Sequence, residues 1–224
     1  MTARGGPAQG EGSMRKLVAP ILILASAAFS IAVWSRLPER MPLHWGVRGE
    51  VNGYGSRAQG AFLLPIIMLG LWLLLRFLPR IDPRRANYAK FADTYDLLVN
   101  SLIALFAVMH VALIGAALGW PVSMERVAPA LIGLQFVILG NALPRARPNW
   151  WFGIRTPWTL SNDRVWTRTH RVGGYLLTGA GIVLLVAAAF PGALTFALGV
   201  AAAIAAGFGS LVYSYFAWKQ ETSQ

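Results

Sequence analysis

Six long apolar runs dominate the sequence and limit what it can fold into. About 20 apolar residues in a helix cross the roughly 30 Å hydrocarbon core of a bilayer, and in lipid the backbone must satisfy its own hydrogen bonds. A helix does so within one segment, so each run predicts one transmembrane helix. The expected fold is therefore all-α, an integral membrane bundle of six transmembrane helices over residues 17–34, 61–78, 97–119, 127–143, 173–190 and 193–217.

The composition agrees with a membrane protein. Of the 224 residues, 56% are hydrophobic and only 13% are charged, whereas about 25% of the residues in soluble domains are charged. The chain contains no cysteine, which excludes disulfides, zinc–thiolate sites and thiol nucleophiles. A net charge of +11 fits nucleic acid, anionic lipid or membrane topology, and the positions of the charges decide between these.

Most basic residues fall on one side of the expected membrane. An even number of helices places both termini on the same side, and with that side cytoplasmic, 15 of the 20 Lys and Arg residues lie inside. Cytoplasmic loops carry such an excess. We therefore predict an N-in/C-in topology, which explains the charge without direct binding of nucleic acid. The basic residues left outside are Arg36, Arg40, Arg48, Arg57 and Arg126.

The runs divide the chain into segments. A cleavable signal peptide ending near Ala27 is one interpretation of the N-terminus, but apolar sequence continues to Trp34 and favours an uncleaved helix. The expected segments are a disordered N-terminal segment (1–13), a first helix pair (14–78) around a turn-rich outer loop (35–60), a cytoplasmic interfacial link (79–96), a four-helix region (97–217) with a basic aromatic inner loop (144–172), and a C-terminal tail (218–224).

Local spacing suggests how the helices pack. In the link, Tyr88, Phe91 and Tyr95 predict an aromatic belt at the membrane surface, or an amphipathic helix lying in it. Small residues allow close helix contact, and they permit a dimer without requiring one. The oligomeric state is therefore open. The small residues in question are Gly115 and Gly119, and the stripe of Gly199, Ala203 and Gly207.

The spans contain little polar chemistry. Every carboxylate lies outside the six runs or at their edges, so no buried acid is available as a proton relay, which weakens an ion-coupled transporter. His110 is the only ionisable side chain deep in the bilayer and is a functional candidate for that reason. A neutral histidine hydrogen-bonded to a neighbouring helix is the simpler interpretation, and Gln135 is one candidate for its partner. We expect no cofactor and no metal.

The outer loop, Leu37 to Arg57, is punctuated by proline and glycine. This spacing excludes a helix, and Asn52-Gly53 predicts a tight turn. A metal site formed by His44 with Glu39 and Glu50 is a weak alternative to a hydrogen-bonded loop histidine. The candidate outer-loop residues are His44, Gly49, Gly53 and Tyr54.

The inner loop combines arginine with tryptophan. Thr159 or Ser161 is expected to cap a helix that begins near Asn162. On that helix Arg164, Arg168 and Arg171 share one face, whereas Trp166 and His170 share another. Such a loop fits an interfacial hairpin that neutralises anionic lipid phosphates, or a docking site for a partner, and residue density alone does not separate the two.

Two stretches resemble a known family. FGIRTPWTLSNDRVWTRTHRVGG, Phe152 to Gly174, resembles the signature of SdpI-type membrane proteins, and LPERMPLHWGVRGEVNGYGS resembles the extracytoplasmic domain of unknown function that accompanies it in longer members. The resemblance implies a multi-pass protein of the bacterial cytoplasmic membrane that gives immunity to a secreted, membrane-active peptide toxin outside. It also implies signalling inside, by recruitment of a small soluble repressor.

The resemblance supplies no catalytic residue, and we expect no enzyme. One alternative is a transporter or lipid-handling protein that uses His110 and the inner arginines. Another is a lipid-phosphate enzyme with His170 and Asp163 as an acid–base pair. The inner residues expected to bind a partner or ligand are Arg155, Thr156, Trp158, Asn162, Trp166, His170 and Arg171.

Overall fold

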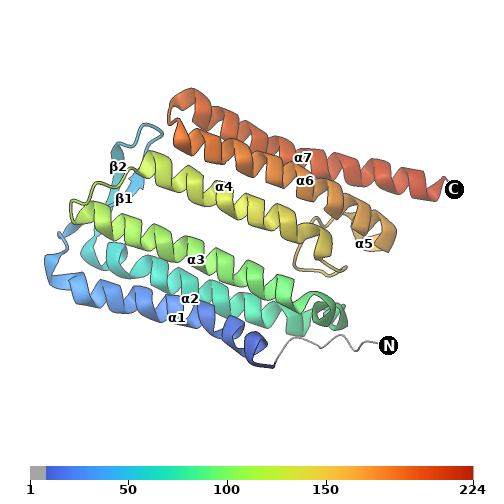
Figure 1. Ribbon diagram of the computed structural model, residues 1–224, viewed down its shortest axis with the longest axis horizontal. Helices are drawn as coiled ribbons and strands as arrows, with labels where there is room; N and C mark the ends of the chain where they lie inside the picture. Colours follow the sequence, from blue (N-terminus) through green and yellow to red (C-terminus); the bar gives the residue numbers. More distant parts are fainter. Residues whose placement is uncertain (1–8, 224) are drawn as a thin grey trace.

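The computed structural model describes residues 9–223. Six helices in it are long and apolar enough to cross a membrane, which confirms that prediction, and they run side by side along the molecule (Figure 1). These are α1 (Gln9–Val33), α2 (Arg57–Ile81), α3 (Ala92–Ala117), α4 (Met124–Ala142), α6 (Asp163–Ala189) and α7 (Ala193–Thr222). They are connected by the 3-10 helices η1 (Trp34–Arg36), η2 (Arg85–Phe91) and η3 (Leu143–Arg145), the short helix α5 (Pro157–Ser161), and the strands β1 (Arg40–Trp45) and β2 (Val51–Ser56).

The helices form two units of three. One unit consists of α1, α2 and α3, the other of α4, α6 and α7, and the two meet where α3 packs on α4. Large apolar side chains such as Leu24, Ile66 and Phe208 are exposed on the outside of the bundle. Such an exterior suits lipid, because hydrocarbon tails solvate apolar side chains as well as a protein core does.

Glycines set the spacing between α4 and α6. A Cβ atom on Gly133 would lie 2.8 Å from the carbonyl oxygen of Gly181. About two helical turns further along α4, a Cβ atom on Gly140 would lie 2.6 Å from the carbonyl oxygen of Gly174. These contacts bring the two backbones together as small residues do in membrane helix pairs. The expected stripes contribute less: Gly199 packs on Leu184 of α6, whereas a Cβ on Gly119 or Gly207 would meet nothing within 4 Å.

The outer loop is an antiparallel β-hairpin. This two-stranded sheet is the only sheet within residues 9–223, and the all-α prediction did not include it. The prediction of a turn at Asn52-Gly53 is wrong. The chain reverses at Gly46 to Glu50, where Gly49 has a φ of 81°, and Gly53 lies inside β2 opposite His44. A Cβ on Gly53 would lie 2.8 Å from the Cβ of His44, so this glycine permits close pairing of the strands and makes no turn.

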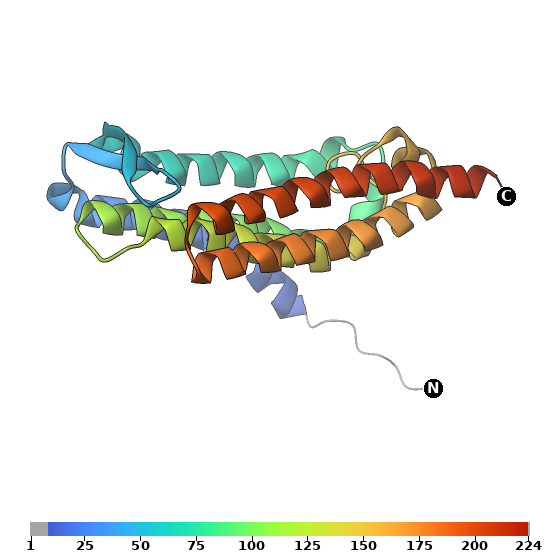
Figure 2. The same cartoon turned by 90° about the horizontal axis from the view of Figure 1, so that it is seen from above.

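The hairpin closes one end of the bundle, which we call the hairpin end. Its side chain Met41 is fully buried against Ala61 of α2 and Ile114 of α3, and Leu37 joins the same cluster. Figure 2 shows the hairpin at this end and the connection between α2 and α3 at the other. We call the opposite end, which holds η2 and α5, the basic end.

Two expectations at the basic end need correction. Helix α1 begins at Gln9, so residues 9–13 are helical and not disordered, and residues 1–8 lie outside the described part of the chain. The aromatic side chains of the link are also not a surface belt. Tyr88, Phe91 and Tyr95 are buried and pack on one another, because Trp72 of α2 and Phe152 of the inner loop cover them.

Candidate functional site

The helix expected to begin near Asn162 is confirmed, because α6 begins at Asp163 and takes up the last part of the inner loop. The side chain of Asn162 caps α6 by accepting hydrogen bonds from the N–H groups of Arg164 and Val165, at 2.8 and 3.2 Å. The prediction of Thr159 or Ser161 as this cap is wrong. Thr159 instead forms a reciprocal capping box with Thr156 at the start of α5, a pattern that satisfies two otherwise free backbone donors.

Trp166 and His170 form the buried centre of the motif. Their rings stack 3.9 Å apart, and the indole N–H of Trp166 donates to the carbonyl of Ala146 at 2.9 Å. His170 Nε2 accepts from the backbone N–H of Ile154 at 3.0 Å, so the proton of the neutral ring lies on Nδ1, which donates to the carbonyl of Trp166 at 2.8 Å. Both nitrogens are thus committed to holding the loop against α6.

The acid–base pair of His170 with Asp163 is therefore wrong. His170 is fully buried and bonded only to backbone, whereas the carboxylate of Asp163 is exposed and pairs with Arg84 at 3.3 Å. A general base must reach the proton that it removes, and His170 has no free nitrogen to do so.

Thr156 and Trp158 dock α5 onto α7. The buried hydroxyl of Thr156 donates to Ser214 Oγ at 3.1 Å, and the ring of Trp158 meets Tyr215 edge to face at 5.2 Å. Of the seven candidate inner residues, only Arg155 and Arg171 are classed as exposed. Arg155 donates to the carbonyl of Trp150 at 2.7 Å. Most of the motif therefore shapes the loop, and a small part of it faces outward.

The exposed part of the inner loop is basic and aromatic. Trp150 and Trp151 are both more than 40% exposed, whereas Arg164 and Arg168 are directed to Glu221 at the end of α7. Arginine and tryptophan are enriched where proteins recognise partners. We call the following set the exposed inner face: Arg145, Arg147, Trp150, Trp151, Arg155 and Arg171.

A buried polar cluster, which the sequence analysis missed, holds the loop in place. The carboxylate of Asp82 accepts hydrogen bonds from the N–H of Arg84 at 2.7 Å, the N–H of Trp150 at 2.9 Å and the hydroxyl of Tyr88 at 3.0 Å. Asn149, fully buried, accepts from the N–H groups of Trp151 and Phe152. Asp82 directly follows α2. A carboxylate at the end of an apolar run is the one sequence feature that points to this cluster.

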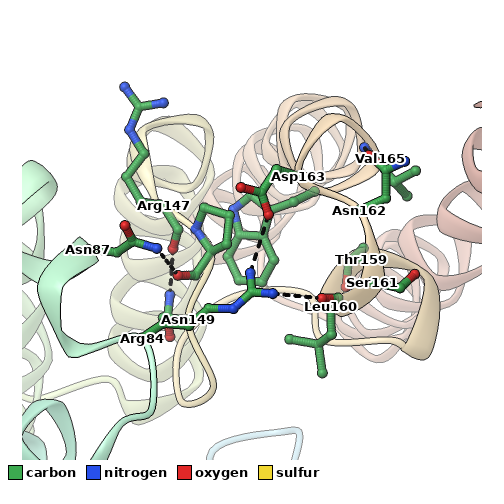
Figure 3. A network of polar contacts seen from close by, with 12 residues as sticks. Arg84, Asn87, Arg147, Asn149, Thr159, Leu160, Ser161, Asn162, Asp163 and Val165 are labelled. Atoms are coloured by element: carbon green, nitrogen blue, oxygen red, sulfur yellow. Dashed lines mark hydrogen bonds and ion pairs between the residues drawn. The ribbon is translucent and has the colours of Figure 1, made fainter.

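Further contacts extend this cluster across the two units (Figure 3). Arg84 donates to the carbonyl of Leu160 at 3.0 Å as well as to Asp163, and Asn87 donates to the carbonyl of Pro148 at 2.8 Å. Asn149 in turn donates to the carbonyl of Arg147. The connection between α2 and α3 is thus tied to the loop between α4 and α6, which joins the two three-helix units at the basic end.

At the hairpin end, His44 on β1 lies opposite Gly53 and near Tyr54 on β2, whereas Gly49 lies in the turn. Nδ1 of His44 hydrogen-bonds the side chain of Asn52, and no group of three acidic or histidine side chains suited to a metal occurs among the described residues. Tyr54 is half exposed and lies under the guanidinium of Arg40, 4.3 Å from the ring centre. Gly49 and Gly53 shape the hairpin and present no side chain.

Behind the hairpin lies an apolar cavity of about 350 Å³. It is bounded by the hairpin, α2 and α3 on one side, and by α4 and the start of α7 on the other, so it occupies the seam between the two units. Glu125 is the one carboxylate in its wall. Its wall also includes His44 and Ala128, and its large apolar side chains include Leu43, Trp45, Leu64, Leu113 and Phe196.

The intramembrane histidine is hydrogen-bonded to a neighbouring helix, as expected, but its partner is not Gln135. His110 is fully buried, and its Nε2 lies 2.9 Å from Ser30 Oγ on α1. Since the Ser30 hydroxyl donates its single proton to the carbonyl of Ala61, Nε2 must donate to Ser30. The expected pairing with Gln135 is wrong, because the Gln135 amide donates to Ser101 Oγ at 3.1 Å.

The fold defines the class of protein: a multi-pass helical membrane protein with a hairpin at one end and a basic aromatic loop at the other. Residues 145–214 match the SdpI/YfhL protein family, and residues 21–69 match DUF1648, a domain of unknown function. The predicted resemblance to SdpI-type proteins is confirmed. The DUF1648 match extends beyond the hairpin into α1 and α2, and the SdpI match runs from the inner loop through α6 into α7.

One curated relative is similar over most of its length. The chain is 25% identical over 178 residues to the immunity protein SdpI of Bacillus subtilis (strain 168), which covers 80% of this chain and 83% of that protein. No solved structure matches the chain.

Proposed function

We propose that this protein is a non-enzymatic immunity protein of the bacterial cytoplasmic membrane, and that it protects the bilayer against a secreted, membrane-active peptide. In this proposal both termini are cytoplasmic, which places the hairpin outside and the exposed inner face inside, in line with the excess of basic residues at that end. The similarity to a relative named as an immunity protein supports the proposal.

The structural observation that carries the proposal is the apolar cavity behind the hairpin. A peptide that inserts into lipid must carry large apolar side chains, and burying one such side chain contributes about 1.5–3 kcal/mol. A cavity of about 350 Å³ at the outer membrane surface has room for side chains of this kind. Capture there of a peptide that arrives from the water would keep it from inserting into the bilayer.

We further propose that the exposed inner face recruits a small soluble repressor when the peptide is bound. This face presents exposed arginine and tryptophan on a loop that the buried cluster holds rigid. Coupling requires two arrangements of the two units with different affinities for peptide and repressor. A fluorescent repressor that reaches the membrane equally with and without the peptide would refute this part of the proposal.

The immunity test uses a sensitive bacterial strain challenged with a panel of membrane-active peptides. Survival and membrane potential are compared for cells with the intact protein, with Ala128→Phe, with Leu134→Phe and with empty vector. Ala128 lines the cavity, whereas Leu134, on the same helix, faces outward. We expect the intact protein and Leu134→Phe to keep cells polarised against one peptide, and Ala128→Phe to lose this protection at an equal amount of protein in the membrane.

Lipid handling is the second candidate function, and the same cavity favours it, because an acyl chain is also apolar. His110 does not support it, since this residue is buried between helices and does not line the cavity. Lipid transfer by the protein in liposomes, together with depolarisation of all strains by every peptide, would place this function ahead of immunity.

A further inference from the structure

A second cavity, of about 490 Å³, lies at the basic end between α1, α2, η2 and the start of α3. It belongs to the first three-helix unit and is separate from the cavity behind the hairpin. Its wall combines basic side chains with aromatic rings. The residues that matter are Lys16 of α1, Trp72, Arg76 and Arg80 of α2, and Tyr95 and Asp96 of α3.

The charges of this cavity do not cancel. Three basic side chains stand against the single carboxylate of Asp96, which leaves a net charge of +2. Arg76 donates to Asp96 at 2.6 Å, and both side chains are largely buried, so this pair is neutral within itself. Lys16 and Arg80 are exposed, and neither is in an ion pair with another side chain of residues 14–223. These two cations are therefore available to an anion.

Apolar side chains lie next to the charges on α2. Leu73 and Phe77 are each about half exposed, and they precede Arg76 and Arg80 by three residues, so each lies one helical turn from a cation. Acyl chains can therefore run along α2 from a headgroup held at the cavity. A soluble anion would gain nothing from these apolar neighbours.

We propose that this cavity binds the headgroup of an anionic phospholipid, with the phosphate held by Lys16 and Arg80 and the acyl chains lying along Leu73 and Phe77. The site goes beyond the proposed immunity function and does not depend on it. Basic pockets between membrane helices commonly hold such headgroups, and each basic residue near an anionic surface contributes about 1 kcal/mol. The bound lipid would stabilise the contact of α1 with α2 and α3.

The test is thermal unfolding of the full chain in neutral detergent micelles with added phosphatidylglycerol or phosphatidylcholine of the same acyl chains. Phosphatidylglycerol is expected to raise the melting temperature of the intact protein more than phosphatidylcholine does. The double variant Lys16→Gln/Arg80→Gln is expected to lose at least half of that difference. In micelles with phosphatidylcholine alone it should melt at the same temperature as the intact protein, which shows that it folds.

The matched control removes two other exposed cations from the same end, Arg85→Gln/Lys219→Gln. It should keep the full phosphatidylglycerol effect and retain as many phosphatidylglycerol molecules in native mass spectrometry as the intact protein. An equal loss in the control and the test variant would overturn the site, because the effect would then be general charge attraction. Equal stabilisation by inorganic phosphate would overturn the assignment to a lipid.

Discussion

The Nε2 atom of His170 accepts a hydrogen bond from the backbone N–H of Ile154, 3.0 Å away, and thereby fixes the inner loop to α6. Replacing His170 by Phe keeps an aromatic ring on Trp166 but leaves the Ile154 N–H without its acceptor. We expect the free energy of unfolding to fall by about 1–3 kcal/mol. Thermal unfolding in micelles checks this, and Arg171→Ala, at the next and exposed position, should change it by no more than about 0.5 kcal/mol.

The close approach of Gly133 and Gly181 leads to a second prediction. Gly181→Ala places a methyl group 2.6 Å from the Gly133 carbonyl oxygen, so α4 and α6 must move apart. Overpacking of this kind costs about 1–3 kcal/mol. Gly179→Ala on the same helix meets nothing within 4 Å and should leave the melting temperature unchanged or raise it. Equal melting temperatures for the two variants would contradict the packing of α4 on α6 described above.

The buried cluster at the basic end predicts how firmly the loop is held. Asp82→Ala removes the acceptor of the Trp150 N–H and of the Tyr88 hydroxyl. A loss of about 1.4 kcal/mol corresponds to a tenfold faster opening, so amide hydrogen exchange over residues 148–154 should accelerate about tenfold or more. Asp93→Ala, which removes an exposed ion pair with Arg15, should leave exchange in this loop unchanged.

His110 is predicted to be structural and replaceable. In His110→Leu the Ser30 hydroxyl still donates to the Ala61 carbonyl, and the Nδ1 atom, which has no hydrogen-bond partner among the described residues, is removed. Hydrogen bonds between membrane helices contribute about 0.6 kcal/mol on average, so the free energy of unfolding should change by less than about 1 kcal/mol. Peptide protection should also survive. A stable His110→Leu protein that fails to protect would instead make His110 a functional residue.

The six spans could be predicted from sequence because run length and hydropathy are local properties. The shared face of Trp166 and His170 followed from their spacing of four residues, and their stacked rings agree with it. The buried cluster could not be predicted in this way. Asp82 and Trp150 are 68 residues apart, and no local period relates a carboxylate at the end of one helix to a backbone N–H in a distant loop.

The close packing of α4 on α6, in contrast, does leave a pattern in the sequence. The glycines that bring α4 and α6 together recur seven residues apart on both helices, at 133 and 140 and at 174 and 181. A pattern shared by two helices is stronger than the stripe on α7, in which Gly199 packs on Leu184 and Gly207 meets nothing within 4 Å. At Asn52-Gly53 the dipeptide itself misled, because the glycine was needed for its small volume beside His44 and not for a turn.

The two ends of the seam between the three-helix units differ mechanically. At the basic end, hydrogen bonds between distant segments fasten the units together. At the hairpin end, the short connection from α3 to α4 links them, and the cavity lies between them. The seam is therefore cross-linked by polar contacts around Asp82 and hollow beside the hairpin. Helix α2, with 25 residues, spans about 37 Å between these two ends, so any rearrangement at the cavity would have to be carried along the helices to reach Trp150 and Arg155.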